Sequence, residues 1–496
     1  TAGRSGARVI LLEQTDHWGG RAPVDGGAVE GTPVESFVDA LVTELSTMNN
    51  VEMRTRVMGA GVYDHGYVLG YERLTDHAPQ STGPRHRLWR IRAGHIITAT
   101  GAIERPLSFA GNDIPGVMLA ASVRDYLVNY GVSVGDRTVV VTNNDDALVE
   151  AGFSVPAVLD ARVLPQDSPL MARAKELGIR VMMGHAISRV RGAKRVTAVE
   201  VCSQAGEGAV LETIACEAVA MSGGWAPVVH LWSHCGGKLI WDTKLATFRP
   251  DVDNPPLGAD GHGFVTAAGA AAGFFGLDDI LHDAHAAADG VATTLGFKLP
   301  SDVASPNAGR QEEAPLTPVW LMPQGAGVKL REKAWLDYQN DVKVSDIRLA
   351  AQEGFVSVEH AKRYTTLGMA TDQGKLSNIN GLATLAGAMN ADIPSVGTTT
   401  FRPPYHPISM GSIGGEARGD VFQPIRRTPM HDWHVANGAE WEPVGHWRRP
   451  YSYNRPGETT HDAVMREVTN TRSKMGLLDA STLGKIIVKG PDAGKF

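Results

Sequence analysis

Short apolar runs separated by polar turns form the main pattern of the chain up to about residue 298. Continuous apolar runs of this length are typical of parallel strands that are buried on both faces. The runs that fit this description are residues 7–13, 95–102, 138–141, 218–221 and 263–267. Residues 51–57 and 89–91 alternate apolar and polar positions instead, as half-buried strands do. The pattern predicts an α/β fold.

The pattern changes after residue 298. Residues 299–328 are rich in Pro, Ala, Gly and Glu and carry no periodic repeat, which predicts a linker. Ser345 and Ser357 are each expected to cap a helix, over residues 346–353 and 358–364. The last third of the chain therefore begins with a small helical domain.

Composition, charge and cysteine content exclude several classes of protein. The 496 residues correspond to about three domains. The formal net charge is −7 and the cations form no long run, so we expect no nucleic-acid partner. Three cysteines, none in a CxxC motif, exclude a disulfide scaffold and a four-cysteine zinc site within this chain. No apolar stretch reaches the roughly 18 residues that span a bilayer, so we expect no membrane and a cytoplasmic location.

Glu13, at the end of the first apolar run, is the first candidate binding residue. An acid at this place in a dinucleotide-binding βαβ unit accepts hydrogen bonds from the ribose hydroxyls of an adenine nucleotide. Gly19 and Gly20 follow, and paired glycines let the backbone approach a nucleotide closely. Taken alone, Glu13 also fits the end of a surface strand, and the two glycines favour the nucleotide site.

Two further turns complete a set that resembles two-dinucleotide-binding-domain flavoproteins. The run at 95–102 ends in the turn Thr100-Gly101, and the run at 263–267 leads into a helix start at Gly269-Ala270. In these flavoproteins an acid follows that glycine, so Ala270 argues against FAD and for NAD in this domain. The residues expected to bind NAD are Glu13, Gln14, Thr15, Gly19, Gly20, Arg21, Val57, Thr100, Gly101, Gly269, Ala270, Phe274 and Gly276.

A second nucleotide-domain-like segment lacks a phosphate loop. The strand at 138–141 is followed by Thr142-Asn143-Asn144-Asp145-Asp146, which has no glycine and two acids that would repel a pyrophosphate. A helix over about 147–151 would be too short for a normal crossover. We interpret this segment as structural. His234 and Cys235 suggest a nucleophile pair, but sequence neighbours rarely face each other, so we expect an ordinary buried thiol at Cys235.

A polar string follows the second predicted helix. Residues 362–375 hold three cations, four hydroxyl groups and two glycines. This composition suits a phosphorylated ligand. A solvated loop has the same composition, so both interpretations stay open.

Several strings in the same order resemble the alpha subunit of heterotetrameric sarcosine oxidase over nearly the whole chain. Residues 100–107 and 111–118 are similar to amine-oxidising flavoproteins that also include opine and cyanide-forming dehydrogenases. The strings that narrow the resemblance to sarcosine oxidase are 142–145, 337–342, 363–369, 400–405 and 426–431. Opine-type dehydrogenases would lack everything beyond about residue 385.

The C-terminal residues resemble the opening of an aminomethyltransferase-type folate domain, on the strings 475–481 and 485–493. We expect a Gly-rich loop before Thr1 and most of the folate domain after Phe496. The implied organisation is an NAD-binding domain at 1–125 and 241–298, a degenerate nucleotide-domain-like insert at 126–240, a linker at 299–328, a small helical domain at the flavin interface at 329–390 and the start of the folate domain at 391–496. The spacing of His431, His434 and Glu440 is poor for zinc, so no metal site is expected.

The resemblance implies a complex that oxidatively demethylates sarcosine to glycine with O2, releases H2O2 and passes the one-carbon unit to tetrahydrofolate. FAD on the beta subunit would oxidise the amine, and FMN held covalently by beta at the alpha–beta interface would meet O2. This chain, with beta, gamma and delta as partners, would bind NAD, shield FMN and carry the folate domain, so no catalytic residue is expected in it. The residues expected at the FMN interface are Arg363, Thr365, Thr366, Thr371, Gln373, Lys375 and Asn378.

Two alternatives stay open at this point. One is a subunit of an opine-type or cyanide-forming amine dehydrogenase. The other is a folate-dependent aminomethyltransferase with a vestigial nucleotide domain. The sequence does not decide whether NAD does redox work or which N-methyl amine is preferred.

Overall fold

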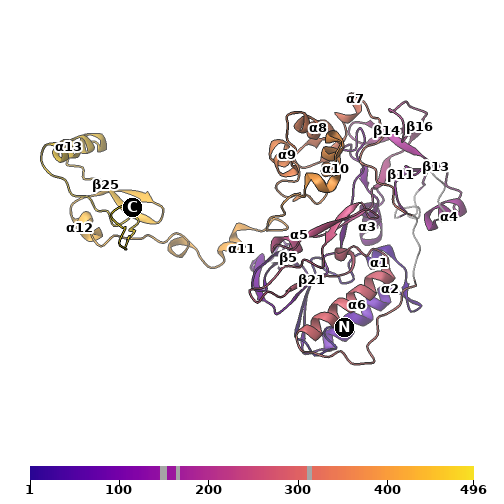
Figure 1. The fold of residues 1–496 in the computed structure, drawn as a ribbon, viewed down its shortest axis with the longest axis horizontal. Helices are drawn as coiled ribbons and strands as arrows, with labels where there is room; N and C mark the ends of the chain where they lie inside the picture. Colours follow the sequence, from indigo (N-terminus) through magenta and orange to yellow (C-terminus); the bar gives the residue numbers. More distant parts are fainter. Residues whose placement is uncertain (146–153, 164–167, 310–314) are drawn as a thin grey trace. The chain divides into compact units, whose positions relative to one another are not determined.

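The computed structural model describes residues 1–145, 154–163, 168–309 and 315–496. These residues form two compact units, Thr1–Ile408 and Ser409–Phe496, whose elements are labelled in Figure 1. No helix among the described residues is long and apolar enough to cross a membrane. The predicted α/β class is confirmed in unit 1, where parallel strands alternate with helices and antiparallel ribbons.

Unit 1 contains two separate pairs of parallel strands. β1 (Val9–Leu12) pairs with β4 (Val51–Arg54), and the crossover between them contains α2 (Val34–Thr47). β8 (Ile96–Thr98) pairs with β21 (Val265–Ala267), and α6 (Leu277–Thr294) follows. β1 is only partly buried, so the prediction of a strand buried on both faces is wrong for this strand.

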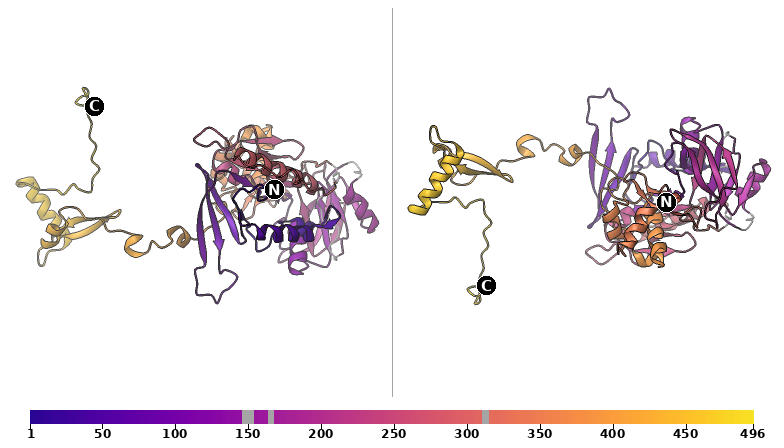
Figure 2. Two further views of the ribbon diagram at one scale, coloured as in Figure 1. Left: turned by 90° about the horizontal axis from the view of Figure 1, so that it is seen from below. Right: turned by 90° about the horizontal axis from the view of Figure 1, so that it is seen from above.

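A long antiparallel ribbon forms a layer of its own in Figure 2. It contains β5 (Val57–Tyr63), β6 (Tyr67–Arg73) and β7 (His86–Arg92). Residues 51–57, expected as one strand, divide between β4 and β5 at Arg56. The φ of Arg56 is +58°, a left-handed conformation that ends a strand.

The centre of unit 1 is a five-stranded parallel sheet in the order β10-β17-β11-β12-β13. All residues of β11 and β17 are buried, as the continuous apolar runs predict. The strands of this sheet are β10 (Val117–Leu119), β11 (Thr138–Thr142), β12 (Val158–Asp160), β13 (Val181–Met183) and β17 (Ala218–Ser222). A three-stranded antiparallel sheet packs in the same hydrophobic core, with β14 (His185–Gly192), β15 (Val196–Ser203) and β16 (Glu212–Ala215).

The described part of the predicted linker is irregular but not a free tether. Met322 is fully buried in the core of the five-stranded sheet, and its amide donates to the carbonyl of Ser108 at 2.8 Å. The amide of Gln324 donates to the carbonyl of Gln204 at 2.8 Å. The backbone groups of this segment make their hydrogen bonds to other segments and not within a helix or strand. The segment therefore has no periodic pattern, and the sequence did not reveal its packing.

Three helices form the next core of unit 1: α8 (Val344–Gln352), α9 (Val358–Thr365) and α10 (Asn378–Met389). Ser357 occupies the N-cap position of α9, as predicted, but its side chain makes no capping hydrogen bond. The N-cap prediction for Ser345 is wrong, because α8 begins two residues earlier and is capped at Lys343. The carboxylate of Asp346 accepts from the Lys343 amide at 2.9 Å, which stabilises the earlier start.

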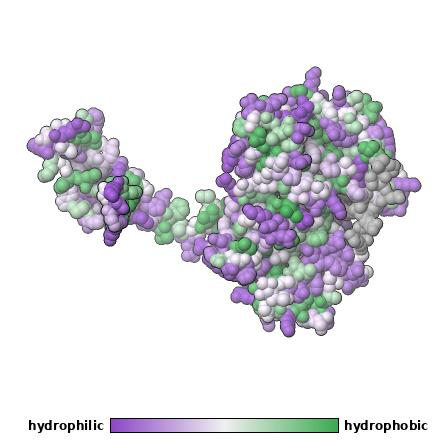
Figure 3. Space-filling view, viewed as in Figure 1, coloured by the Kyte–Doolittle hydropathy of each residue, from purple (hydrophilic) through white to green (hydrophobic). Residues whose placement is uncertain are grey.

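Unit 2 contains a hairpin and three α-helices, the first of which is the short α11 (Met410–Gly414). β24 (Glu440–Val444) pairs with β25 (Trp447–Ser452), α12 (His431–Ala436) precedes them and α13 (Thr460–Ser473) follows. Thr459 caps α13 through a reciprocal pair of bonds with Asp462. Apolar surface is visible on this part of the chain in Figure 3, and its exposed apolar residues include Met410, Ile413, Val421, Phe422, Leu477 and Ile486.

The remaining elements are short connectors and edge strands, apart from the two longer helices α3 and α4. They are α1 (Ala22–Asp25), β2 (Ala28–Val29), β3 (Thr32–Pro33), β9 (Ala102–Glu104), α3 (Ala120–Tyr130), α4 (Pro169–Glu176), β18 (Trp225–Pro227), α5 (His230–His234), β19 (Leu239–Asp242), β20 (Thr247–Pro250), η1 (Gly269–Ala272), α7 (Val328–Arg331), β22 (Trp335–Asp337), β23 (Val342–Lys343), η2 (Ile393–Val396) and η3 (Gly419–Val421).

Candidate functional site

Glu13 lies at the carboxyl end of β1, as predicted. Its Oε1 accepts from the Thr15 amide at 2.7 Å and from the Thr15 hydroxyl at 2.8 Å. Its backbone carbonyl accepts from the Val57 amide at 2.8 Å, which joins the tip of β1 to the start of β5. The two Thr15 contacts both use Oε1 and hold the carboxylate in one orientation.

Arg21 is engaged with two acids. Its guanidinium pairs with Asp25 at 2.7 Å and with Asp125 at 3.0 Å, and it lies over the ring of Trp225. These partners neutralise its charge locally, so Arg21 is a weaker phosphate ligand than its place in the sequence suggests. Gly20 before it has a φ of +56° and faces open space, with no atom within 4 Å of where a Cβ would lie.

The turn at Gly101 has the same open geometry. Its φ is +72°, and an added Cβ would meet no atom within 4 Å. The hydroxyl of Thr100 donates to the carbonyl of Val228 at 2.8 Å, and the Val228 amide donates to the carbonyl of Gly101 at 2.9 Å. The turn is therefore held rigidly against the strand pair β9–β18 while one side of it stays open.

Gly269 has a partner that the sequence pattern missed. The Asp283 carboxylate of α6 accepts from the Gly269 amide at 2.6 Å, and burial raises the pKa of Asp283. An acid is therefore present near Gly269, but it comes from a position fourteen residues later and not from position 270. Its carboxylate accepts from the amide that an anionic ligand would use. Phe274 is 43% exposed and Gly276 caps α6. The open glycines fit a dinucleotide, whereas the Gly269 amide is already bonded within the protein.

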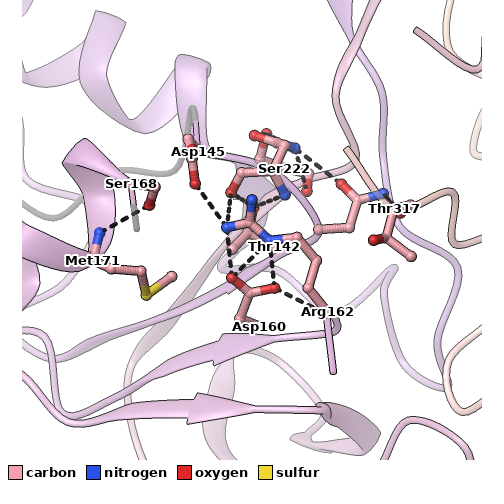
Figure 4. Close-up of polar contacts among 10 residues, drawn as sticks. Thr142, Asp145, Asp160, Arg162, Ser168, Met171, Ser222 and Thr317 are labelled. Atoms are coloured by element: carbon pink, nitrogen blue, oxygen red, sulfur yellow. Dashed lines mark hydrogen bonds and ion pairs between the residues drawn. The ribbon is translucent and has the colours of Figure 1, made fainter. Parts of the chain in front are cut away.

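The second domain carries a buried ion-pair network where a nucleotide would lie. Arg162 is almost completely buried, and its Nη2 contacts Asp145 and Asp160 at 2.7 Å each (Figure 4). Burial raises the pKa of Asp160. Asn144 donates from the end of β11 to Ser222 of β17. Side chains thus fill the carboxyl edge of β11, β12 and β17, the edge at which open α/β sheets bind ligands.

This network gives a physical reason for the acids that we expected to repel a pyrophosphate. Asp145 serves as a counterion of Arg162. The hypothesis that this domain has no nucleotide site remains a prediction. The short helix predicted at about 147–151 lies outside the described residues.

The polar string 362–375 begins in the last turn of α9, and from Thr366 onward it forms a constrained loop that leads to α10. Thr366, Ala370 and Gln373 have φ values of +68°, +51° and +51°, which are unfavourable for residues with a Cβ. Asp337 accepts from the Gly368 amide at 2.7 Å, and Asp372 accepts from Ser377 at 2.7 Å. Strained backbone of this kind persists only where surrounding bonds impose it, and such sites are often functional.

Lys375 lies at the edge of a pocket between this loop and the strand pair β9–β18. Its Nζ donates to the Thr371 carbonyl at 3.0 Å and lies 4.6 Å from the centre of the Tyr405 ring. Burial lowers the pKa of Lys375 and raises that of Tyr405 to about 12. The accessible space in this pocket is about 30 Å³, and its polar lining residues are His230, Thr247, Lys375, Asn378 and Thr398.

The other predicted FMN residues are not all turned toward this pocket. Arg363 is exposed and pairs with Glu359 at 3.6 Å. The hydroxyl of Thr365 donates to the Ala361 carbonyl, and Asn378 is buried with its Oδ1 accepting from Thr399. Thr366 and Thr371 are exposed. Lys375, Asn378 and the backbone around Gln373 therefore form the compact part of the predicted set. Sequence reasoning missed the polar pocket residues His230, Thr247 and Thr398.

The buried His230 and the half-buried His234 make the stability of unit 1 sensitive to acid. Burial lowers the pKa of His230 to about 3 and that of His234 to about 4. The unfolded chain binds a proton at each of these histidines near pH 6.5, and the folded chain does not. The free energy of unfolding is therefore not reduced by either histidine above about pH 7. It should fall by up to about 1.4 kcal/mol per pH unit per histidine below pH 6.5.

His234 offers a direct check of this prediction. Neither of its ring nitrogens has a hydrogen-bond partner among the described residues, so His234→Leu should keep the packing and flatten the loss of stability between pH 6.5 and 4. Urea unfolding at a series of pH values measures the slope. An equal slope in His234→Leu and the unchanged chain would contradict the prediction.

In unit 2, both ring nitrogens of His434 are bonded within the protein. Nδ1 lies 2.5 Å from the Tyr453 hydroxyl and Nε2 lies 2.9 Å from Asp479. His431 stacks on Trp441 instead of approaching His434 as a second ligand would. Among the residues with described positions, no group of three or more His, Cys, Asp or Glu could hold a metal ion.

Family models match two parts of the chain. The Sarcosine oxidase A3 domain matches residues 331–417 and the GCVT N-terminal domain matches residues 430–496. The alpha subunit of sarcosine oxidase from Rhizobium meliloti (strain 1021) is 40% identical, and that from Corynebacterium sp. (strain P-1) is 38% identical. Both similarities cover 100% of this chain, and they cover 49% and 52% of those relatives.

More distant similarities bear on the fold. An opine oxidase subunit of Rhizobium meliloti (strain 1021) is 24% identical over 82% of this chain and 93% of that protein. The crystal structure of L-proline dehydrogenase from P. horikoshii superposes with a TM-score of 0.61 at 18% identity, covering 83% of this chain and 77% of that one.

The fold and these matches define a class. The chain is a protein with a dinucleotide-binding, flavoprotein-like fold, a small helical domain and an aminomethyltransferase-like domain. Along its whole length it is similar to sarcosine oxidase alpha subunits, at 37–40% identity. The chain spans about half the length of the curated relatives that it matches.

Proposed function

We propose that this chain is the nucleotide-binding, flavin-shielding subunit of a sarcosine oxidase complex. The complex would demethylate sarcosine to glycine with O2, produce H2O2 and deliver the one-carbon unit to tetrahydrofolate. The observation that carries the proposal is the similarity to sarcosine oxidase alpha subunits along all of this chain. The partners would be beta, gamma and delta subunits, with FAD on the partner side and the reaction in the cytoplasm.

NAD is the nucleotide that the first domain fits best. The oriented carboxylate of Glu13 suits ribose hydroxyls and would repel the 2′-phosphate of NADP. Gly20 and Gly101 offer open backbone, which suits the close approach of a dinucleotide. Asp283 at the Gly269 amide adds a negative charge that disfavours a phosphate at that place. We therefore propose that Gly269 and Ala270 contact an uncharged part of NAD.

The loop before α10 is the part of the chain that best fits a flavin phosphate or ring. When bound, FMN would supply the electron transfer to O2. Lys375 would hold a positive charge beside it, since its Nζ is anchored by the Thr371 carbonyl and the Tyr405 ring. The strained backbone at Ala370 and Gln373 would present a fixed surface that excludes water.

Identifying the cofactors of the assembled complex tests the proposal. The chain is produced with its partner subunits, the nucleotides released by heat are identified by mass, and H2O2 is measured with sarcosine and O2. We expect NAD and FAD in the released fraction, and FMN attached to a partner chain. Release of NADP, or a complex without flavin and without peroxide formation, would contradict the proposal.

Removing Lys375 of the loop together with Arg363 at the end of α9 should slow reoxidation of the flavin. In the double variant Lys375→Ala, Arg363→Ala, loss of a charge-assisted bond of about 1.5–3 kcal/mol predicts a rate at least about tenfold lower. Lys375 should account for most of it, because Arg363 is exposed and paired with Glu359. Stopped-flow mixing of the reduced complex with O2 measures the rate. The exposed Lys329→Ala is the control, and an unchanged rate in the double variant would refute this role.

A further inference from the structure

His230 joins two parts of unit 1 that are far apart in sequence. It is the first residue of α5, and it is 4% exposed. Its ring lies 4.3 Å from the ring of Phe401 and 4.9 Å from that of Tyr405, measured between centres. Its Nε2 lies 2.9 Å from the carbonyl oxygen of Gln373. A carbonyl only accepts, so Nε2 carries the hydrogen and donates it.

The residue that His230 holds belongs to the strained loop. Gln373 has a φ of +51°, and its side-chain amide turns back to the carbonyl of Ala370 at 2.7 Å. Lys375, two residues further on, lies over Tyr405, which also touches the His230 ring. The donation from His230 therefore acts on the part of the loop that presents Lys375.

His230 is also tied to the turn at Thr100 and Gly101. Val228, two residues before it, bonds to both residues of that turn, at 2.8 and 2.9 Å. Only Val229 separates Val228 from His230, at which α5 begins. The contacts run without a gap from the turn through Val228 and His230 to the carbonyl of Gln373.

We propose that His230 is a positioning residue that couples the turn Thr100-Gly101 to the loop at Gln373, so that a nucleotide bound at the turn rigidifies the loop. The inference rests on the proposed function for the identity of the ligands, NAD at the turn and FMN at the loop. A nucleotide that takes no part in electron transfer would then still support the flavin-facing surface. Such a coupling is a free energy that can be measured.

Hydrogen exchange of the assembled complex measures it directly. In His230→Phe, which keeps a ring between Phe401 and Tyr405 but loses the donor, amides of residues 371–378 should exchange roughly five- to tenfold faster, as expected for one lost hydrogen bond. His230→Gln places an amide donor near the position of Nε2 and should restore most of the protection. His234→Leu, on the same short helix, should leave these amides unchanged. Equal exchange in His230→Phe and the unchanged complex, or an equal increase in His234→Leu, overturns the proposal.

A second measurement needs no variant. Adding NAD to complex freed of nucleotide should slow exchange of residues 371–378 and shift the absorption spectrum of the interface flavin. NAD that binds without changing either signal overturns the coupling. If NAD does not bind at all, the proposed function fails at the nucleotide, and the coupling to NAD fails with it. The exchange of the His230 variants then still decides whether His230 positions the loop.

Discussion

Replacing Arg162 with methionine is expected to destabilise unit 1 by about 3–5 kcal/mol. The change leaves the buried carboxylates of Asp145 and Asp160 without the cation that both contact at 2.7 Å. Uncompensated charge in the interior costs far more than the lost contacts alone. Urea unfolding followed by tryptophan fluorescence should show the unfolding midpoint moving to a lower urea concentration. The domain that contains the five-stranded sheet should lose its cooperative unfolding transition before the rest of unit 1.

Two controls separate charge burial from the loss of a long side chain. Arg180 makes a two-pronged pair with Glu212 on the same domain but in solvent, so Arg180→Met should leave the midpoint unchanged. The combined replacement Arg162→Met, Asp160→Leu, Asp145→Asn should recover much of the lost stability, because it removes all three charges together. A combined variant as unstable as Arg162→Met would mean that packing, rather than charge, dominates at this edge of the sheet.

Replacing Glu13 with alanine should weaken NAD binding by about 10²- to 10⁴-fold. A carboxylate that accepts from two ribose hydroxyls loses two charge-assisted bonds of about 1.5–3 kcal/mol each. Titration of NAD into the assembled complex, after removal of bound nucleotide, measures the dissociation constant. Glu13→Gln, which keeps one acceptor but no charge, should fall between alanine and the unchanged residue.

Asp16 provides a matched comparison for Glu13. It lies three residues further along and is an exposed acid that pairs with Arg56, so Asp16→Ala should bind NAD as before. If Glu13→Ala also binds NAD as tightly as the unchanged complex, the nucleotide does not use the tip of β1. An increase in NADP affinity in Glu13→Ala would instead support the assignment, because the repelling charge has been removed.

Much of the α/β architecture follows from local pattern. The runs that became β11 and β17 are apolar at nearly every position, which suits only a strand covered on both faces. Glu13 falls at the end of its strand and Ser357 at the cap of its helix, since each of these positions depends on neighbouring residues alone. The strings near residues 337 and 363 also carry the family resemblance, which the A3-domain match from residue 331 confirms.

Other features depend on contacts between distant residues, which no local pattern contains. Asp283 reaches the Gly269 amide from the following helix, and Arg21 is neutralised by Asp125 from α3. The linker prediction missed the burial of Met322, because backbone bonds to the segments around Ser108 and Gln204 leave no periodic trace.

Local pattern was enough to predict the apolar strands, the acid at the tip of β1 and the polar string at 362–375. The resemblance of several strings to a known family implied that this string lies on the flavin side. Which of those polar residues are free to meet a ligand depends on the folded chain. Folding anchors Lys375 on Tyr405 and places His230 against Gln373. The pair of Arg363 with Glu359 is different, because it joins residues one helical turn apart on α9. Hydrophobic periodicity is a property of near neighbours in the sequence, whereas charge compensation and hydrogen-bond partners are chosen between distant segments, because burial makes an unpaired group costly.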